Sequence, residues 1–182
     1  MKAVEALVFP LYQPIEVPAF AHCSAQQPCW ERLDLMMPYI AGAGTILDVG
    51  CHTGWFCRQL SLAYGFQTIG IDRSPEWIAA AKELHPSGNY CLGDVAETEL
   101  PQVDIVLCLS VAMYFGDASE AIFWKLSHAA RTMFLDFGGM YATSMPFDES
   151  TAIQWMLKHS VFSRGSLIGR SSIHRPMFMF SR

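Results

Sequence analysis

The sequence predicts a single α/β domain built on a doubly wound sheet of about seven strands, with helices on both faces. We expect this sheet to be mostly parallel and to end in a C-terminal antiparallel hairpin. From residue 45 onward, short apolar runs of strand length alternate with segments whose apolar residues recur at helical spacing. The first run leads into a glycine-bearing turn and a helix, as in a parallel strand-helix-strand unit. Three successive runs end at an acid, as expected at a ligand-binding sheet edge.

The composition is that of one globular domain. The chain has 182 residues, of which 52% are hydrophobic and 16% charged, which suits one substantial core and is too short for two ordinary domains. No apolar run reaches membrane-spanning length, and the proline-rich start is a poor secretory signal. We therefore expect a cytoplasmic protein with no membrane partner. The net charge of −5 makes nucleic acid an unexpected partner.

The cysteines and histidines are scattered along the chain. There are six of each, without a C-x-x-C pair, an H-x-x-x-H pair or an H-E-x-x-H motif. Such spacing gives no support for a metal site. We expect buried free thiols in place of disulfides.

Residues 1–27 are predicted to form an N-terminal arm, followed by the main domain over residues 28–182. Prolines recur through the arm, and no helical or strand period is sustained. The arm either folds over the ligand edge of the sheet as a lid, with Tyr12 or Phe20 stacked on a ring, or merely packs on the body. Residues 28–41 then carry apolar residues at helical spacing and form a helix that leads into the first strand.

Residues 45–49 are predicted to form the first strand, because they are mainly aliphatic apart from Asp48 near the carboxyl end. Gly50 and Gly54 permit a tight turn and close approach of the backbone to a ligand, before a helix over residues 55–64. A dinucleotide site would instead show G-x-G-x-x-G and a helix N-terminus that accepts a pyrophosphate. A carboxylate two residues ahead of the first glycine repels a pyrophosphate and favours a cation.

Two further strands, over residues 66–71 and 89–92, are also followed by acids. Asp72 lies 24 positions after the acid of the first strand, a separation typical of a carboxylate that binds ribose hydroxyls. Its alternative role is helix capping, because a Ser-Pro-Glu sequence opens a predicted helix over residues 75–84. Asp94 is either a third binding acid or a turn aspartate after glycine. Acids at three successive strand ends favour binding.

The second half of the chain continues the alternation. Asp136 follows the fifth strand and either orients a substrate or caps the next loop. That loop, over residues 138–147, mixes aromatic residues with glycine and suits substrate recognition. We expect strands over residues 103–109 and 132–135, helices over 118–129 and 151–159, and a terminal hairpin over 161–168 and 176–180.

Residues 48–54 resemble motif I of the class I S-adenosylmethionine-dependent methyltransferases, usually an acid, any residue, Gly, Cys or Ser, Gly, any residue, Gly. The resemblance covers about residues 30–182, and its specific motifs lie within 45–115. His52 stands where the family most often has its middle glycine, so we expect it to have a positive φ or to re-route the turn. The resemblance implies S-adenosyl-L-methionine as cofactor, with a binding set of Asp48, Gly50, Cys51, His52, Gly54, Asp72, Arg73, Asp94, Val95 and Ser110.

The family resemblance also implies roles for individual positions. Asp94 would take the adenine amino group, while Val95 packs on the ring. The end of the strand over residues 103–109 would sit nearest the transferred methyl. Methyltransferases acting on amide or adenine nitrogens often carry Asn or Asp, then Pro-Pro and an aromatic residue there. This sequence lacks that motif, which disfavours planar-nitrogen chemistry.

The resemblance implies transfer of a methyl group to a small-molecule or glycan-like acceptor. A general base is needed only if the nucleophile is a hydroxyl or a protonated amine. The candidates for that role are His174, Tyr114 and His52.

The C-terminal segment carries an excess of basic residues. No acid follows Glu149, whereas lysine and arginine recur to the end. This pattern indicates either a solvated hairpin face or an anionic acceptor held by Arg170 or Arg175.

Two other functions remain open for this sequence. One is a non-catalytic S-adenosylmethionine-binding or regulatory module, which would keep the acids without a competent acceptor pocket. The other is a nucleotide-dependent reductase, which Asp48 disfavours. The sequence predicts neither the oligomeric state nor the acceptor.

Overall fold

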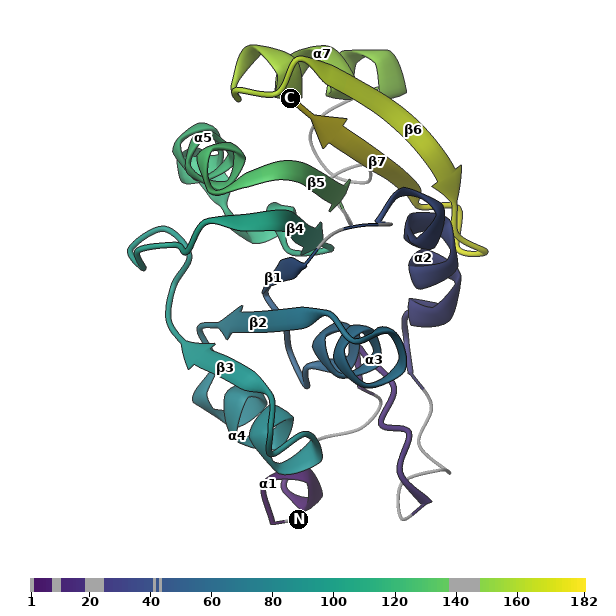
Figure 1. Ribbon diagram of the computed structural model, residues 1–182, viewed down its shortest axis with the longest axis vertical. Helices are drawn as coiled ribbons and strands as arrows, with labels where there is room; N and C mark the ends of the chain where they lie inside the picture. The colour runs from purple at the N-terminus through teal and green to yellow at the C-terminus, as the bar shows by residue number, and fades with distance from the viewer. Residues whose placement is uncertain (1, 8–10, 19–24, 41, 43, 138–147) are drawn as a thin grey trace.

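A seven-stranded mixed sheet organises the chain, and its strand order is β3-β2-β1-β4-β5-β7-β6 (Figure 1). This computed structural model describes residues 2–7, 11–18, 25–40, 42, 44–137 and 148–182. The first five strands pair in parallel, whereas β7 runs antiparallel to both β5 and β6. The predicted fold class is confirmed. The strands are β1 (Thr45–Val49), β2 (Gln67–Asp72), β3 (Asn89–Leu92), β4 (Val103–Leu109), β5 (Ala130–Asp136), β6 (Arg164–Arg170) and β7 (Pro176–Ser181).

Helices connect these strands and cover the sheet. The bounds of α3, α4, β1, β3 and β4 agree with the prediction, while β6 begins three residues later than expected. Among the described residues, no helix is both long and apolar enough to cross a bilayer. The helices are α1 (Lys2–Glu5), α2 (Cys29–Met36), α3 (Trp55–Tyr64), α4 (Pro75–Leu84), α5 (Ser119–Ala129) and α7 (Glu149–Lys158), with 3₁₀ turns over Met37–Tyr39, Ala112–Tyr114 and Gly116–Ala118.

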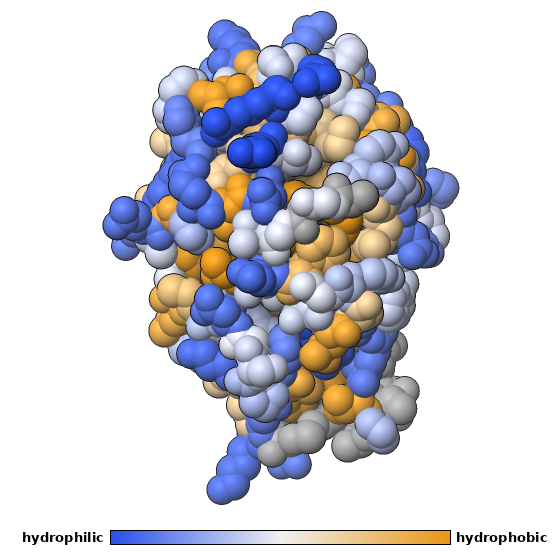
Figure 2. Space-filling model, in the orientation of Figure 1, coloured by the Kyte–Doolittle hydropathy of each residue, from blue (hydrophilic) through white to orange (hydrophobic). Residues whose placement is uncertain are grey.

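Two apolar layers lie on opposite faces of the sheet because side chains alternate along each strand. In β1, Leu47 and Val49 pack in the layer that contains residues of α5 and α7. Ile46 lies in the other layer, against residues of α2 and α3. Figure 1 shows α2 and α3 on one side of the strands and α5 on the other. On the molecular face drawn in Figure 2, hydrophobic groups are scattered among hydrophilic ones and do not form a continuous cover.

The sheet has its topological switch at β1, which pairs with β2 on one side and β4 on the other. Chain connections leave β1 and β4 in opposite directions, so their carboxyl ends flank an open crevice. Ligands of doubly wound folds bind at such a position. The switch therefore places the acid-bearing turns after β1 and β2 and the turn after β4 around one site.

Side-chain hydrogen bonds attach the N-terminal arm to α4 and α3. The Glu83 carboxylate of α4 accepts hydrogen bonds from Ala3 N and Val4 N at 2.8 and 3.0 Å, which satisfies donors at the start of α1. Gln13 Oε1 accepts from Trp55 N at 3.1 Å and so caps α3, whose own N-cap glycine has no side chain to do so. The sequence prediction missed α1, because four residues are too few to show a period. Phe20 lies outside the described residues.

Two constraints require glycine at position 54, a positive φ and the close approach of the Tyr90 side chain. It ends the turn after β1 with φ at 73°. A Cβ added there would lie 2.6 Å from Tyr90 Cε1 and Oη. Gly65, at the other end of α3, has a similar φ of 76°, but an added Cβ would meet nothing within 4 Å.

This pair separates the backbone cost of a positive φ from a steric clash. We expect Gly65→Ala to lower the free energy of unfolding by about 1 kcal/mol, because alanine is strained in the left-handed region. Gly54→Ala should cost roughly 1–3 kcal/mol more, since Tyr90 must also move. Urea unfolding of both variants measures the difference. Equal losses would show that Tyr90 yields freely.

Candidate functional site

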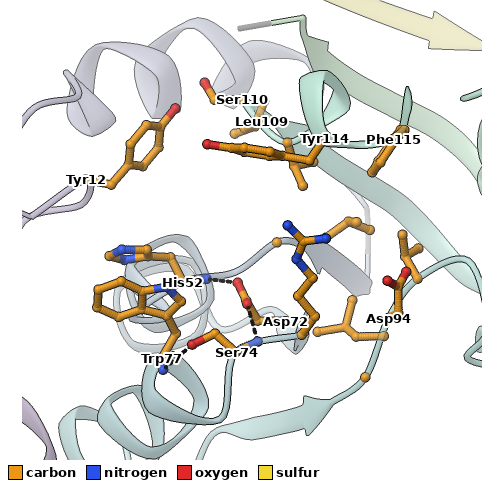
Figure 3. A pocket seen from close by; sticks show the side chains of 17 residues that line it. Tyr12, His52, Asp72, Ser74, Trp77, Asp94, Leu109, Ser110, Tyr114 and Phe115 are labelled. Carbon is orange, nitrogen blue, oxygen red and sulfur yellow. Dashed lines mark hydrogen bonds between the residues drawn. The ribbon is translucent and has the colours of Figure 1, made fainter. Parts of the chain in front are cut away.

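A cavity of about 530 Å³ opens at the carboxyl ends of the central strands. Its size is within the range of small-molecule and cofactor sites. Figure 3 shows its side chains arranged in two rows, with Tyr12, Ser110 and Tyr114 facing His52, Trp77 and Asp72 across the opening. Seven of the ten residues predicted to bind a cofactor line this cavity: Gly50, His52, Asp72, Arg73, Asp94, Val95 and Ser110.

Asp72 joins two turns at the base of the cavity. One carboxylate oxygen accepts from His52 N at 2.9 Å, and the other accepts from Ser74 N at 2.9 Å (Figure 3). The capping role considered for Asp72 is filled by Ser74, whose Oγ accepts from Trp77 N at 3.2 Å. Each carboxylate oxygen retains acceptor capacity beyond its one backbone bond. Asp72 can therefore both fix the turns and accept hydroxyl groups of a ligand.

Asp94 and Val95 form one end of the cavity, away from His52 and Trp77 (Figure 3). One Asp94 oxygen accepts from Ala96 N at 2.9 Å, and among the described residues its other oxygen has no hydrogen-bond partner. The Val95 side chain is buried beside it. A carboxylate acceptor next to an apolar side chain suits a flat heteroaromatic ring with an amino group.

Three of the predicted cofactor residues lie behind the cavity wall and are not part of it. Asp48 is 2% exposed, and Cys51 and Gly54 are also buried. The Cys57 thiol approaches the Asp48 carboxylate at 3.8 Å. Burial, together with the charge of Asp72, raises the pKa of Asp48 to about 8. Asp48 therefore lies under the turn after β1 and does not contact the cavity directly.

His52 has a φ of 53°, so the expectation of a left-handed residue in the glycine position is confirmed. Its ring stacks on Trp77 with the centroids 3.9 Å apart, and Tyr12 lies 6.0 Å from it on another side. Burial lowers the pKa of His52 to about 4, so its imidazole is neutral at pH 7. The three rings form one end of the cavity. They also border a second, mainly apolar cavity of about 670 Å³ between the arm and α4.

Gly50 allows close approach of the chain segment that follows β4. Its φ is 69°, and an added Cβ would lie 2.7 Å from Val111 Cγ2. Both residues line the cavity. A larger residue at position 50 would push the two turns apart.

A buried polar network lies where β4 and β5 end. Arg32 and Asp136 form an ion pair at 2.8 Å with both side chains 1% exposed. Ser110, which has a φ of 57°, donates to Asp136 at 2.9 Å and accepts from Arg32 at 2.8 Å. Arg175 also donates to the Ser110 hydroxyl, at 2.9 Å. Ser110 thus links β5, α2 and the terminal hairpin, and Asp136, predicted either to orient a substrate or to cap the next loop, is part of this network.

The candidate bases lie in different places. Tyr114 lines the cavity mouth with 64% of its surface exposed, and the Arg73 guanidinium carbon lies 5.8 Å from its ring centroid. His52 also lines the cavity. His174 is an exposed residue of the turn between β6 and β7 and is not on the cavity wall. The loop over residues 138–147, expected to recognise a substrate, lies outside the described residues.

Sequence reasoning missed several residues that shape the site. Trp77 and Ser74 belong to the wall, and Gln13 and Arg32 support it. Arg32 did leave a signal, since it is a charge on the apolar face of its helix. Gln13 left none, because its partners lie about 40 positions further along the chain.

The groups around the cavity fit a cationic nucleoside. Asp72 and Asp94 line the cavity, and their carboxylates favour a positive charge and offer acceptors for hydroxyl and amino groups. Asp48 lies beneath the wall, and its raised pKa keeps it mainly protonated at pH 7. Among the described residues, no group of three or more His, Cys, Asp or Glu is placed to hold a metal ion. All five cysteines in the described part of the chain are free thiols; four are buried as expected, whereas Cys91, in the edge strand β3, is exposed.

Comparisons with known proteins agree with this geometry. A family model described as a methyltransferase domain matches residues 46–132. The 2-methyl-6-phytyl-1,4-hydroquinone methyltransferase of Synechocystis sp. is 32% identical over 111 residues, which cover 58% of this chain and 32% of that protein. The malonyl-[acyl-carrier protein] O-methyltransferase of Pectobacterium atrosepticum is 35% identical over 85 residues, covering 47% of this chain and 33% of that protein. The matched region is about a third of the length of these relatives.

The fold also matches a solved structure over nearly the whole chain. The bifunctional kinase-methyltransferase WbdD superposes with a TM-score of 0.79 at 22% identity. The match covers 99% of this chain and 45% of that one. At this identity the likeness shows a shared fold.

The raised pKa of Asp48 predicts a pH-dependent stability. Its folded pKa, about 8, is above the ordinary 3.8, so the folded state holds more protons between these values and stability falls as pH rises. We expect Asp48→Asn, which mimics the neutral acid, to remove this loss, which is at most about 1.4 kcal/mol per pH unit. Urea unfolding at pH 5 to 8 measures it. Parallel curves for the two proteins would mean that Asp48 is already ionised at pH 5.

Proposed function

Because the chain belongs to the class I S-adenosylmethionine-dependent methyltransferases, we propose that its cavity binds S-adenosylmethionine and presents the methyl group to a small-molecule acceptor. One observation carries the proposal. Acids at or near the carboxyl ends of β1, β2 and β3 lie around one cavity, Asp72 and Asp94 on its wall and Asp48 beneath it. A nucleotide-dependent reductase would place a pyrophosphate against this negative field.

Under this proposal, different cavity residues bind the three parts of the cofactor: the adenine, the ribose and the methionine end. Asp94 and Val95 would hold the adenine, and Asp72 the ribose hydroxyls. The methionine end would lie against the turn at Gly50 and His52, where no side chain at position 50 obstructs it. Ser110, at the end of β4, would then be nearest the methyl group.

The chemistry asks mainly for positioning. When bound, the cofactor supplies an electrophilic methyl on a sulfonium, and the protein's task is to align a nucleophile and exclude water. His52 is neutral at pH 7 and so has an unprotonated ring nitrogen, but its pKa of about 4 makes it a weak proton acceptor. Tyr114, at the cavity mouth, is the other candidate base on the wall and could hydrogen-bond an acceptor.

Several finer points belong to the same proposal. The acceptor is a small molecule or a glycan-like group, and the relative named for a hydroquinone supports the small molecule. The arm over residues 1–27 acts as a lid, which the position of Tyr12 on the cavity wall supports. A cytoplasmic location is supported by the free thiols of the described cysteines.

Calorimetry with S-adenosylhomocysteine, S-adenosylmethionine and NAD tests the cofactor directly. We expect the first two to bind and NAD not to bind, because the acids repel a pyrophosphate. Binding of NAD alone would contradict the proposal. Cofactor binding with no turnover in a broad acceptor screen would favour the non-catalytic module.

Asp72→Asn tests the ribose contact. The amide removes a charged acceptor, and hydrogen bonds to charged groups are worth roughly 1.5–3 kcal/mol, so affinity for S-adenosylhomocysteine should fall about tenfold or more. The matched control is Asp104→Asn, because Asp104 also accepts two backbone N–H groups, from Gly44 and Thr45, and is not on the cavity wall. The control should keep its affinity. Equal affinities in both variants would leave Asp72 with only its role in the turns.

A further inference from the structure

Arg175 connects the terminal hairpin to the cavity rim. It lies just before β7 and is half-buried. Its Nη1 donates to Ser110 Oγ at 2.9 Å and to Tyr12 Oη at 3.2 Å. Both partners line the cavity, whereas Arg175 is not itself part of the wall. Figure 3 shows the Tyr12 hydroxyl directed toward Ser110 at this rim.

The charge of Arg175 is not neutralised by the described part of the protein. No carboxylate among the described residues pairs with it, whereas its neighbour in the hairpin, Arg170, is paired with Glu149. The nearby acid, Asp136, already pairs with Arg32. The cluster of Arg32, Asp136 and Arg175 therefore has a net charge of +1 next to the cavity.

Hydrogen-bond donors are also left over at this position. A guanidinium has five N–H donors, and the two contacts of Arg175 involve only Nη1. Tyr12 Oη accepts from Arg175, and among the described residues its own O–H has no acceptor. A charged fork beside a free hydroxyl is the donor arrangement that binds a carboxylate or phosphate.

We propose that Arg175 and Tyr12 bind an acidic group, carboxylate or phosphate, of the methyl acceptor. This rests on the proposed function, because it places the acceptor beside Ser110, where the methyl group would lie. The rim position favours the acceptor over the carboxylate of the cofactor's methionine end, which would lie deeper, at the turn after β1. Of the two arginines that the sequence offered for an anion, the structure selects Arg175, because Arg170 is engaged by Glu149.

The test measures the binding of inorganic phosphate to the full chain. NMR monitors the titration, which is carried out with and without S-adenosylhomocysteine. Arg175→Met should weaken phosphate binding about tenfold or more, because charge-assisted donors are lost. Arg175→Lys, which keeps the charge without the fork, and Tyr12→Phe should give smaller losses. The matched control, Arg170→Met, removes the same charge from the same hairpin and should leave phosphate binding unchanged. Thermal unfolding of each variant confirms that it is folded.

Two results would overturn the proposal. One is phosphate binding that is absent in the wild type or equal in Arg175→Met and Arg170→Met. The other is a loss of S-adenosylhomocysteine binding in Arg175→Met with no loss for 5′-methylthioadenosine, which lacks the amino-acid carboxylate, since Arg175 would then serve the cofactor. Failure of the wild type to bind S-adenosylhomocysteine would instead reject the proposed function, and the phosphate titration without cofactor would still decide the Arg175 site.

Discussion

The site depends on one carboxylate that holds two turns together. Asp72 accepts from His52 N in the turn after β1 and from Ser74 N in the turn after β2. The first bond fixes a residue with a positive φ, and the second sets the approach to α4. Because both turns are held, the His52 ring meets Trp77 in a stack that closes one end of the cavity. A single side chain thus couples the backbone strain of one turn to the shape of the binding site.

A second constraint acts at the end of β4, where charge is buried. The Arg32–Asp136 pair is 1% exposed, and such a pair is costly unless further hydrogen bonds support it. Ser110 supplies that support and also receives Arg175, so a helix, two strand ends and the terminal hairpin share one hydroxyl. This network fixes the cavity wall opposite Asp72. Hydrogen bonds of Asp72 therefore hold one side of the cavity, and the network around Ser110 holds the other.

The sequence predicted the helices and strands better than it predicted which side chains are buried and which line the cavity. The bounds of α3 and β4 follow from local signals, a glycine that ends the helix and a continuous apolar run. The family resemblance placed Asp72, Asp94 and Ser110 on the cavity wall, but it grouped Asp48 with them, and Asp48 lies beneath the turn. Strand alternation gives the face of a residue and not its distance from a ligand. The contacts of Gln13 and Arg175 join distant segments, which no local pattern encodes.

The two carboxylates of the cavity wall, Asp72 and Asp94, are proposed to bind the two parts of one nucleoside, its ribose and its base. A crystal structure of the chain with S-adenosylhomocysteine tests this most directly. We expect ribose hydroxyls within hydrogen-bond distance of the Asp72 carboxylate, and the adenine amino group at Asp94 with the ring on Val95. A nucleoside bound elsewhere, for example in the second cavity between the arm and α4, would contradict it, as would a ribose that makes no contact with Asp72.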